Sequence, residues 1–195
     1  MPRSRATRHA VLAALITALG LGAALPGGAP AATSSTSSAK AKMAAAKMRS
    51  TRATIKNDLW ATVNICDTDE HPDTIGIRGS MPGSGKSRER MYMRFQLQYF
   101  DQQEKEWHNI GASGDSDFVP VGSASKRRAR ESGRNFTVRP PRTGAFYLRG
   151  AVTFEWRRGT KVTRRHRKRT TSKHPGTAGA DPVGFSAGKC ILRAG

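Results

Sequence analysis

The sequence predicts an all-β domain, an antiparallel sandwich of about seven or eight strands, behind a secretion signal. From about residue 53 onward, apolar and polar residues alternate with a period of two, which is typical of half-buried strands. Gly, Pro, Asp and Ser separate the alternating runs, and no long run has the apolar period of a helix. A small β-barrel would give the same pattern and stays an alternative.

The N-terminal residues 1–31 have the three parts of a secretory signal peptide. Arg3, Arg5 and Arg8 precede an apolar stretch from Ala10 to Leu25, and small residues follow up to Ala31. The apolar stretch is shorter than the roughly 20 residues that a membrane-spanning helix needs. We therefore expect cleavage after Ala31, secretion of the mature chain, and no transmembrane span after cleavage.

Residues 32–52 are rich in Ala, Ser, Thr and Lys and contain no aromatic residue. Such a segment buries too little apolar surface to offset the entropy cost of ordering, so it is predicted to be a flexible tether. Its run of Ala and Lys at 39–48 favours a short helix, although that helix lacks a long apolar face. The β domain is expected to occupy residues 53–195.

Two strands are predicted most clearly. The first covers Arg90–Phe100, and a polar turn at Asp101–Glu104 leads from it to a partner strand that holds Trp107 and Ile110. The second covers Ala145–Trp156, where the apolar positions share one face and Arg149 lies on the other. Shorter strands are predicted at Leu59–Cys66, Thr74–Gly79, Phe136–Arg139, Lys161–Arg169 and Lys189–Arg193.

The chain has two cysteines, Cys66 and Cys190. Outside the cell, an isolated pair predicts a disulfide, and two distant thiols are too few ligands for a metal site. The bond would join the first strand to the last and close a loop of more than 120 residues. Chain-entropy arguments give such a bond roughly 4–5 kcal/mol of stabilisation.

The chain is strongly basic. Its formal net charge of +20 falls to +17 after removal of residues 1–31, which carry three arginines and no acidic residue. A hairpin around Gly159 would gather alternate side chains of its two arms into a cationic strip that attracts anionic polymers. The residues of this predicted anion-binding strip are Arg157, Arg158, Lys161, Arg164, Arg165, Arg167, Lys168 and Arg169.

Anionic cell-envelope polymers or acidic polysaccharide are the partners that this charge predicts. Nucleic acid is disfavoured, because residues 157–173 contain no aromatic side chain on which bases could stack. In a second interpretation, the charges only keep an exposed edge strand soluble and unpaired.

Two motifs resemble cofactor or metal sites and fall short of them. Ser80–Ser87 lacks the first glycine of a nucleotide-binding phosphate loop, and strand-like alternation follows it where a helix is needed. The acidic segment Asp67–Asp73 lacks the spacing of a calcium-binding loop and is predicted to be a solvated turn. No cofactor and no metal are therefore expected.

Catalytic motifs are missing from the sequence. It contains neither the G-x-S-x-G nucleophile elbow nor the H-E-x-x-H zinc motif. We expect a non-enzymatic binding or structural module of the cell envelope or exterior. The alternative is a secreted hydrolase whose site is assembled from long loops.

The segment Pro141–Gly150 resembles the turn and penultimate strand of immunoglobulin-like or fibronectin-III-like domains. The stretch from Asn64–Asp67 to Ser186–Cys190 is similar to secreted actinobacterial proteins of unknown function, over about residues 55–193. The resemblance implies an immunoglobulin-like sandwich and an extracellular location, and no activity. One departure is that antibody-type domains have cysteines closer together in sequence, whereas this pair lies at the two ends of the domain.

Overall fold

The computed structural model describes residues 35–194, so the signal peptide predicted at residues 1–31 lies outside the described part. A single α-helix, α1 (Ser35–Asp58), is present in this range. The predicted tether at 32–52 is therefore helical from Ser35 onward, because Ala, Lys and Met all favour helix. Within the described range, no helix is both long and apolar enough to cross a bilayer.

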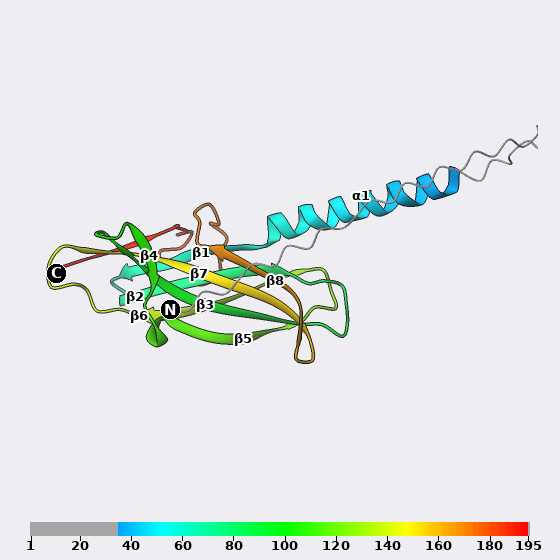
Figure 1. The fold of residues 1–195 in the computed structure, drawn as a ribbon. Helices are drawn as coiled ribbons and strands as arrows, with labels where there is room; N and C mark the ends of the chain where they lie inside the picture. The colour runs from blue at the N-terminus through cyan, green and yellow to red at the C-terminus, as the bar shows by residue number, and fades with distance from the viewer. Residues whose placement is uncertain (1–34, 195) are drawn as a thin grey trace, which may run out of the picture. The chain divides into compact units, whose positions relative to one another are not determined.

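Nine strands are described and form two antiparallel sheets (Figure 1). The predicted all-β class is thus confirmed, with nine strands in place of seven or eight. The smaller sheet has the order β1-β2-β6, and the larger sheet has six strands. In the smaller sheet the strands are β1 (Trp60–Thr68), β2 (His71–Pro82) and β6 (Ala129–Thr137).

The six-stranded sheet is built outward from β3 (Arg90–Asp101) and β7 (Ala145–Arg158). Successive parts of β3 pair with β5 and β4, while successive parts of β7 pair with β9 and β8. These four outer strands are β4 (Glu106–Asn109), β5 (Asp115–Ser123), β8 (Lys161–Arg169) and β9 (Cys190–Arg193), and a short 3-10 turn, η1 (Ala112–Gly114), precedes β5.

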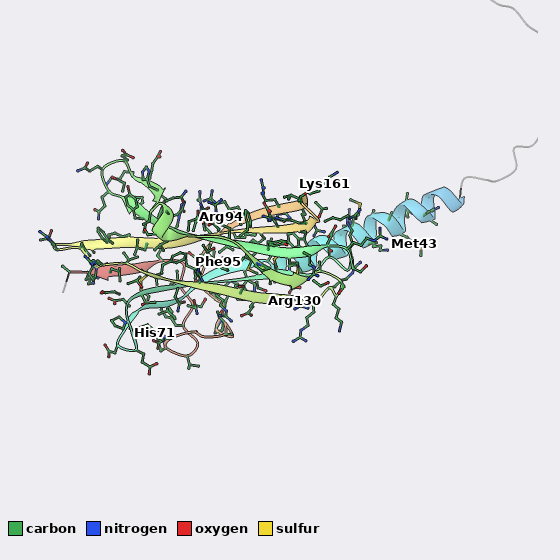
Figure 2. All side chains as sticks on the ribbon, turned by 90° about the horizontal axis from the view of Figure 1, so that it is seen from below. Met43, His71, Arg94, Phe95, Arg130 and Lys161 are labelled. Atoms are coloured by element: carbon green, nitrogen blue, oxygen red, sulfur yellow. A yellow bond between two sulfur atoms is a disulfide. The ribbon has the colours of Figure 1, made fainter. Side chains whose placement is uncertain are left out.

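The two sheets face each other across one apolar core. Figure 2 shows Phe95 between the two layers, whereas Arg94 lies on the side of the six-stranded sheet away from the smaller one. The sheets approach closely at Gly150, where an added Cβ would lie 2.8 Å from the side chain of Ile77. Trp156 is fully buried and its indole N–H donates to the carbonyl of Pro82, which links the sheets. We call the far side of the six-stranded sheet its outer face.

Most predicted strands are present, and β8 has the predicted bounds. The first strand, β1, begins at Trp60, one residue after the predicted start at Leu59, and α1 ends at Asp58. Strand β5 was missed. It contains Asp115, Pro120 and Gly122, which are residues that strands disfavour, and it is tolerated because it lies at an edge of the sheet.

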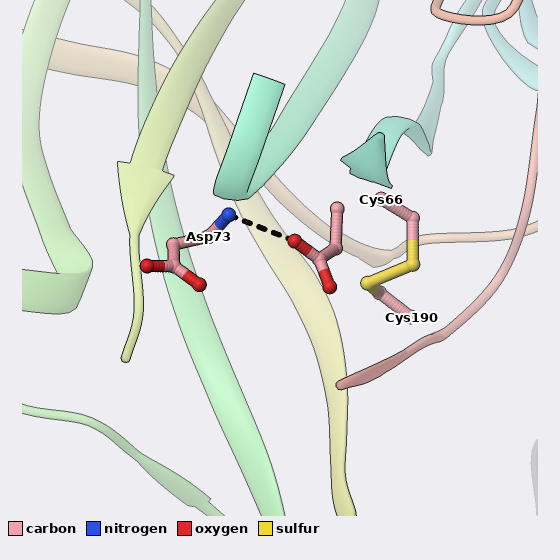
Figure 3. The surroundings of a disulfide bond; sticks show 4 residues. Cys66, Asp73 and Cys190 are labelled. Atoms are coloured by element: carbon pink, nitrogen blue, oxygen red, sulfur yellow. Dashed lines mark hydrogen bonds between the residues drawn. A yellow bond between two sulfur atoms is a disulfide. The ribbon is translucent and has the colours of Figure 1, made fainter. Parts of the chain in front are cut away.

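The disulfide between Cys66 and Cys190 is confirmed (Figure 3). It joins β1 of the smaller sheet to β9 of the larger one across a sequence separation of 124 residues. Beside it, the backbone N–H of Asp73 donates to the carboxylate of Asp67 at 2.8 Å, which closes the turn between β1 and β2.

Replacing both cysteines by alanine should lower the free energy of unfolding by about 5 kcal/mol, because the unfolded chain regains the entropy of a very long loop. Denaturant unfolding followed by tryptophan fluorescence measures this. The unaltered chain under reducing conditions is the control and should match the double variant. A loss below about 1 kcal/mol would show that the bond constrains the unfolded state little.

Candidate functional site

Strands β7 and β8 form the hairpin that the predicted strip requires, with Gly159 at a positive φ of 57° in its turn. The register divides the strip between the two faces of the sheet. Arg165, Arg167 and Arg169 lie opposite Glu155, Thr153 and Ala151 on the outer face. Arg164 and Lys168 lie opposite the buried Trp156 and Val152 and therefore point to the other side. The eight predicted residues do not form one continuous surface.

Part of the outer-face charge is already neutralised. The carboxylate of Glu155 is fully buried and accepts hydrogen bonds from Arg157 at 2.6 Å and from Arg165 at 2.5 Å. Arg157 also stacks over the rings of Tyr92 and Phe118, at 4.4 Å from each centroid. A buried carboxylate needs such partners, so these two arginines are held by the fold.

Arg94 is also paired with a carboxylate. Asp115 accepts from Nε of Arg94 at 2.8 Å and from Nη2 at 2.5 Å, in a two-pronged ion pair. The hydrogen bond from Arg94 is the main reason that the pKa of Asp115 lies below its usual value. Gln96 adds a further donor to Asp115.

The remaining outer-face arginines surround a pocket of about 440 Å³. The side chains of Arg149, Arg167 and Arg169 on the outer face line it, and no carboxylate does. The lining residues are Gln98, Trp107, Arg149, Ala151, Arg167, Lys168 and Arg169. We call this the arginine pocket. In the described part of the chain, no ion pair joins Arg149, Arg167 or Arg169 to a carboxylate.

Arg149 lines the arginine pocket, and two contacts fix its guanidinium. Its Nε donates to Gln98 at 2.9 Å, and its guanidinium carbon lies 4.1 Å from the ring centroid of Trp107. Gln98 is fixed in turn by donating to Asn109 at 3.0 Å. Burial, then the charges of Arg169 and Arg167, lower the pKa of Arg149 to about 10. The guanidinium is still protonated at neutral pH, and a nearby anion would offset the repulsion that it experiences.

Sequence reasoning placed the strip by the density of charge along the chain and therefore missed Arg149. The one feature of the sequence that could have indicated Arg149 is its position on the polar face of the predicted strand Ala145–Trp156. Trp107 was seen only as part of a partner strand. The two residues meet because β3, which pairs with both β4 and β7, brings positions more than 40 residues apart together.

A separate cluster lies at the turn between β1 and β2. Asp181, from the segment between β8 and β9, accepts hydrogen bonds from Thr68 and from Nδ1 of His71, the latter at 2.8 Å. The hydrogen bond from Thr68, and to a lesser extent the one from His71, hold the pKa of Asp181 below its usual value. Glu70, His71 and Asp181 each offer one ligand atom, and all three atoms lie within 4.8 Å of one another. An imidazole and two carboxylates are ligands that zinc accepts.

The same cluster bears on the hydrolase alternative. A hydrolytic triad needs a hydroxyl on one imidazole nitrogen and a carboxylate on the other. Here Thr68 and His71 both bond to the carboxylate, and no hydroxyl among the described residues bonds to Nε2 of His71. His174 contacts the hydroxyl of Thr171 at 3.3 Å, but its ring is stacked on Trp60 and no hydrogen bond joins it to a carboxylate in this range.

Comparison with known proteins gives no relative for this arrangement: no family model, no curated protein and no solved structure matches the chain. The chemistry of the outer face is therefore interpreted from its own residues.

The Arg94–Asp115 pair predicts a pH-dependent contribution to stability. Because the folded-state pKa of Asp115 is lowered, its stabilisation is fully present above about pH 4 and is lost as the pH falls through the folded pKa. Asp115→Asn should therefore lower the free energy of unfolding at pH 7 and have a much smaller effect near pH 2.

Urea unfolding of both chains at a series of pH values measures this dependence. Asp69→Asn is the matched control, since Asp69 is exposed and its carboxylate makes no ion pair or hydrogen bond among the described contacts. Its effect should be small at every pH. An equal loss for Asp115→Asn at pH 7 and pH 2 would contradict the assignment.

Proposed function

We propose that this chain is a secreted, non-enzymatic binding module for anionic polymers, and that the arginine pocket is its binding site. The observation that carries the proposal is the pocket itself, in which Arg149, Arg167 and Arg169 converge without a carboxylate partner. Guanidinium groups bind carboxylate, sulfate and phosphate through paired N–H donors. Like charges held close together raise the energy of the unbound site, so an anion that enters it relieves their repulsion.

The contrast with the rest of the outer face supports this choice. Arg94, Arg157 and Arg165 each have a carboxylate partner at 2.5–2.6 Å, so ion pairs within the fold neutralise their charge. Two of the pocket arginines have neutral acceptors instead. Arg149 donates to Gln98, and Arg167 donates to Gln96 at 3.3 Å. Neutral acceptors orient a guanidinium and leave its charge available to a ligand.

For the fold and location, we propose an immunoglobulin-like sandwich that is exported and anchored by no membrane span once the signal peptide is removed. Two antiparallel sheets on one core support the sandwich. The disulfide supports export, because such bonds persist mainly in oxidising compartments. The proposed relation to secreted actinobacterial proteins of unknown function rests on the sequence resemblance.

The proposal is tested by measuring affinity for polyanions across a salt series, with dextran sulfate, polygalacturonate and polyphosphate as probes. The variant carries Arg149→Gln, Arg167→Gln and Arg169→Gln. Its affinity should fall at least tenfold, and the slope of log affinity against log salt should become shallower by about three, one for each lost contact.

The matched control carries Lys126→Gln, Arg127→Gln and Arg128→Gln, which remove the same charge from an exposed segment before β6. It should keep most of the affinity. An equal loss in the two triple variants would mean that net charge alone attracts polyanions, and the arginine pocket would not be a binding site.

A further inference from the structure

A second pocket adjoins the arginine pocket on the outer face. It has a volume of about 240 Å³ and is lined by Phe100, Gln102, Trp107, Tyr147 and Lys189. We call it the aromatic pocket. Trp107 lines both pockets, so one extended ligand can occupy them together. Along β3, Gln98 of the first pocket and Phe100 of the second are one two-residue step apart, which is about 7 Å in a strand.

Three aromatic side chains line the aromatic pocket. Tyr147 is 36% exposed, and Phe100 and Trp107 are half-buried with ring centroids 5.3 Å apart. Gln102 and Lys189 supply hydrogen-bond donors, and Nζ of Lys189 lies 5.6 Å from the ring centroid of Trp107. Flat apolar surface surrounded by polar groups suits a ring that has apolar faces and a hydroxylated edge, which is the chemistry of a sugar.

Trp107 lies in both pockets and contacts the guanidinium of Arg149. Arg149 stacks over its ring with Nε already committed to Gln98, which orients the guanidinium and leaves the two terminal nitrogens to bind an anion. A carboxylate or sulfate accepts two parallel N–H bonds from such a group. The outer face thus offers an anion site and a ring site one strand step apart.

We propose that the polymer bound here is an acidic polysaccharide, with a charged group in the arginine pocket and a neighbouring sugar ring in the aromatic pocket. This inference rests on the proposed function and assigns its ligand class. A polyphosphate chain carries charge without rings and would use the arginine pocket alone.

Single-stranded nucleic acid has both rings and charge, but it carries a phosphate on every nucleotide and is bound along a continuous cationic groove. The outer face interrupts such a groove, because Glu155 and Asp115 neutralise the arginines that continue along β7, β8 and β3. One cluster of available cations beside one cluster of rings fits a polymer whose charges are spaced by uncharged ring surface.

Titration calorimetry of the full mature chain tests the inference with four probes: galacturonate oligomers, heparin oligomers, polyphosphate and oligothymidylate. The key variant is Tyr147→Leu, which keeps apolar bulk in the strand and removes the flat ring. The matched control is Tyr99→Leu, an equally exposed tyrosine of β3 that pairs with Leu148 on the opposite face of the sheet. Thermal unfolding of both variants reports whether they fold.

Tyr147→Leu should weaken the acidic oligosaccharides roughly tenfold and leave polyphosphate unchanged, while Tyr99→Leu changes neither. The triple arginine variant should weaken all of these probes. Unchanged oligosaccharide affinity in folded Tyr147→Leu would overturn the polysaccharide assignment and leave the arginine pocket standing. Oligothymidylate that binds more tightly than the oligosaccharides and loses affinity in Tyr147→Leu would overturn it in favour of nucleic acid. Failure of the triple variant to weaken any probe would overturn the proposed function itself.

Discussion

The pairing of β3 with β7 is the constraint on which the rest of the structure depends. Its register runs without a shift from Arg90 opposite Arg157 to Tyr99 opposite Leu148. On one face, it gives the core its buried residues, such as Phe95 opposite Val152. On the other face, the same register sets Gln98 opposite Arg149 and Gln96 opposite Ala151, which positions the arginine pocket. A slip of one residue would move every one of these side chains to the wrong face.

Two carboxylates decide which arginines of the outer face are neutralised by an ion pair and which are not. Glu155 is fully buried between Arg157 and Arg165, and Asp115 binds Arg94 from the edge strand β5. Glu155 lies opposite Tyr92, and Asp115 lies opposite Gln96, near the middle of the β3–β7 pair. Arg149 and Arg167 have glutamine acceptors instead. Burial first, and then the charges of Arg169 and Arg167, lower the pKa of Arg149. The net charge of the chain is therefore a poor guide to where an anion would bind.

Much of the fold could be predicted because strand alternation is a local signal. The bounds of β8, the start of β7 and the joining of the first and last strands by Cys66 and Cys190 follow from residues close in sequence or from the absence of other partners. The site could not be predicted in the same way. Arg149, Trp107 and Gln98 come from three strands, and only the register brings them together. Asp181 reaches His71 across 110 positions, which no spacing rule anticipates.

The two interpretations of the basic strip, binding and protection of an edge, are compatible with each other in strand β8. Strand β8 ends the six-stranded sheet and pairs only with β7, so its outer backbone edge needs charge to discourage pairing with another chain. Arg164 and Lys168 point to the core-facing side, where Arg164 lies over the ring of Trp156 at 4.7 Å. Arg167 and Arg169 point to the outer face and line the arginine pocket. Because successive residues of a strand face opposite ways, a run of consecutive cations serves the edge and the proposed site at once.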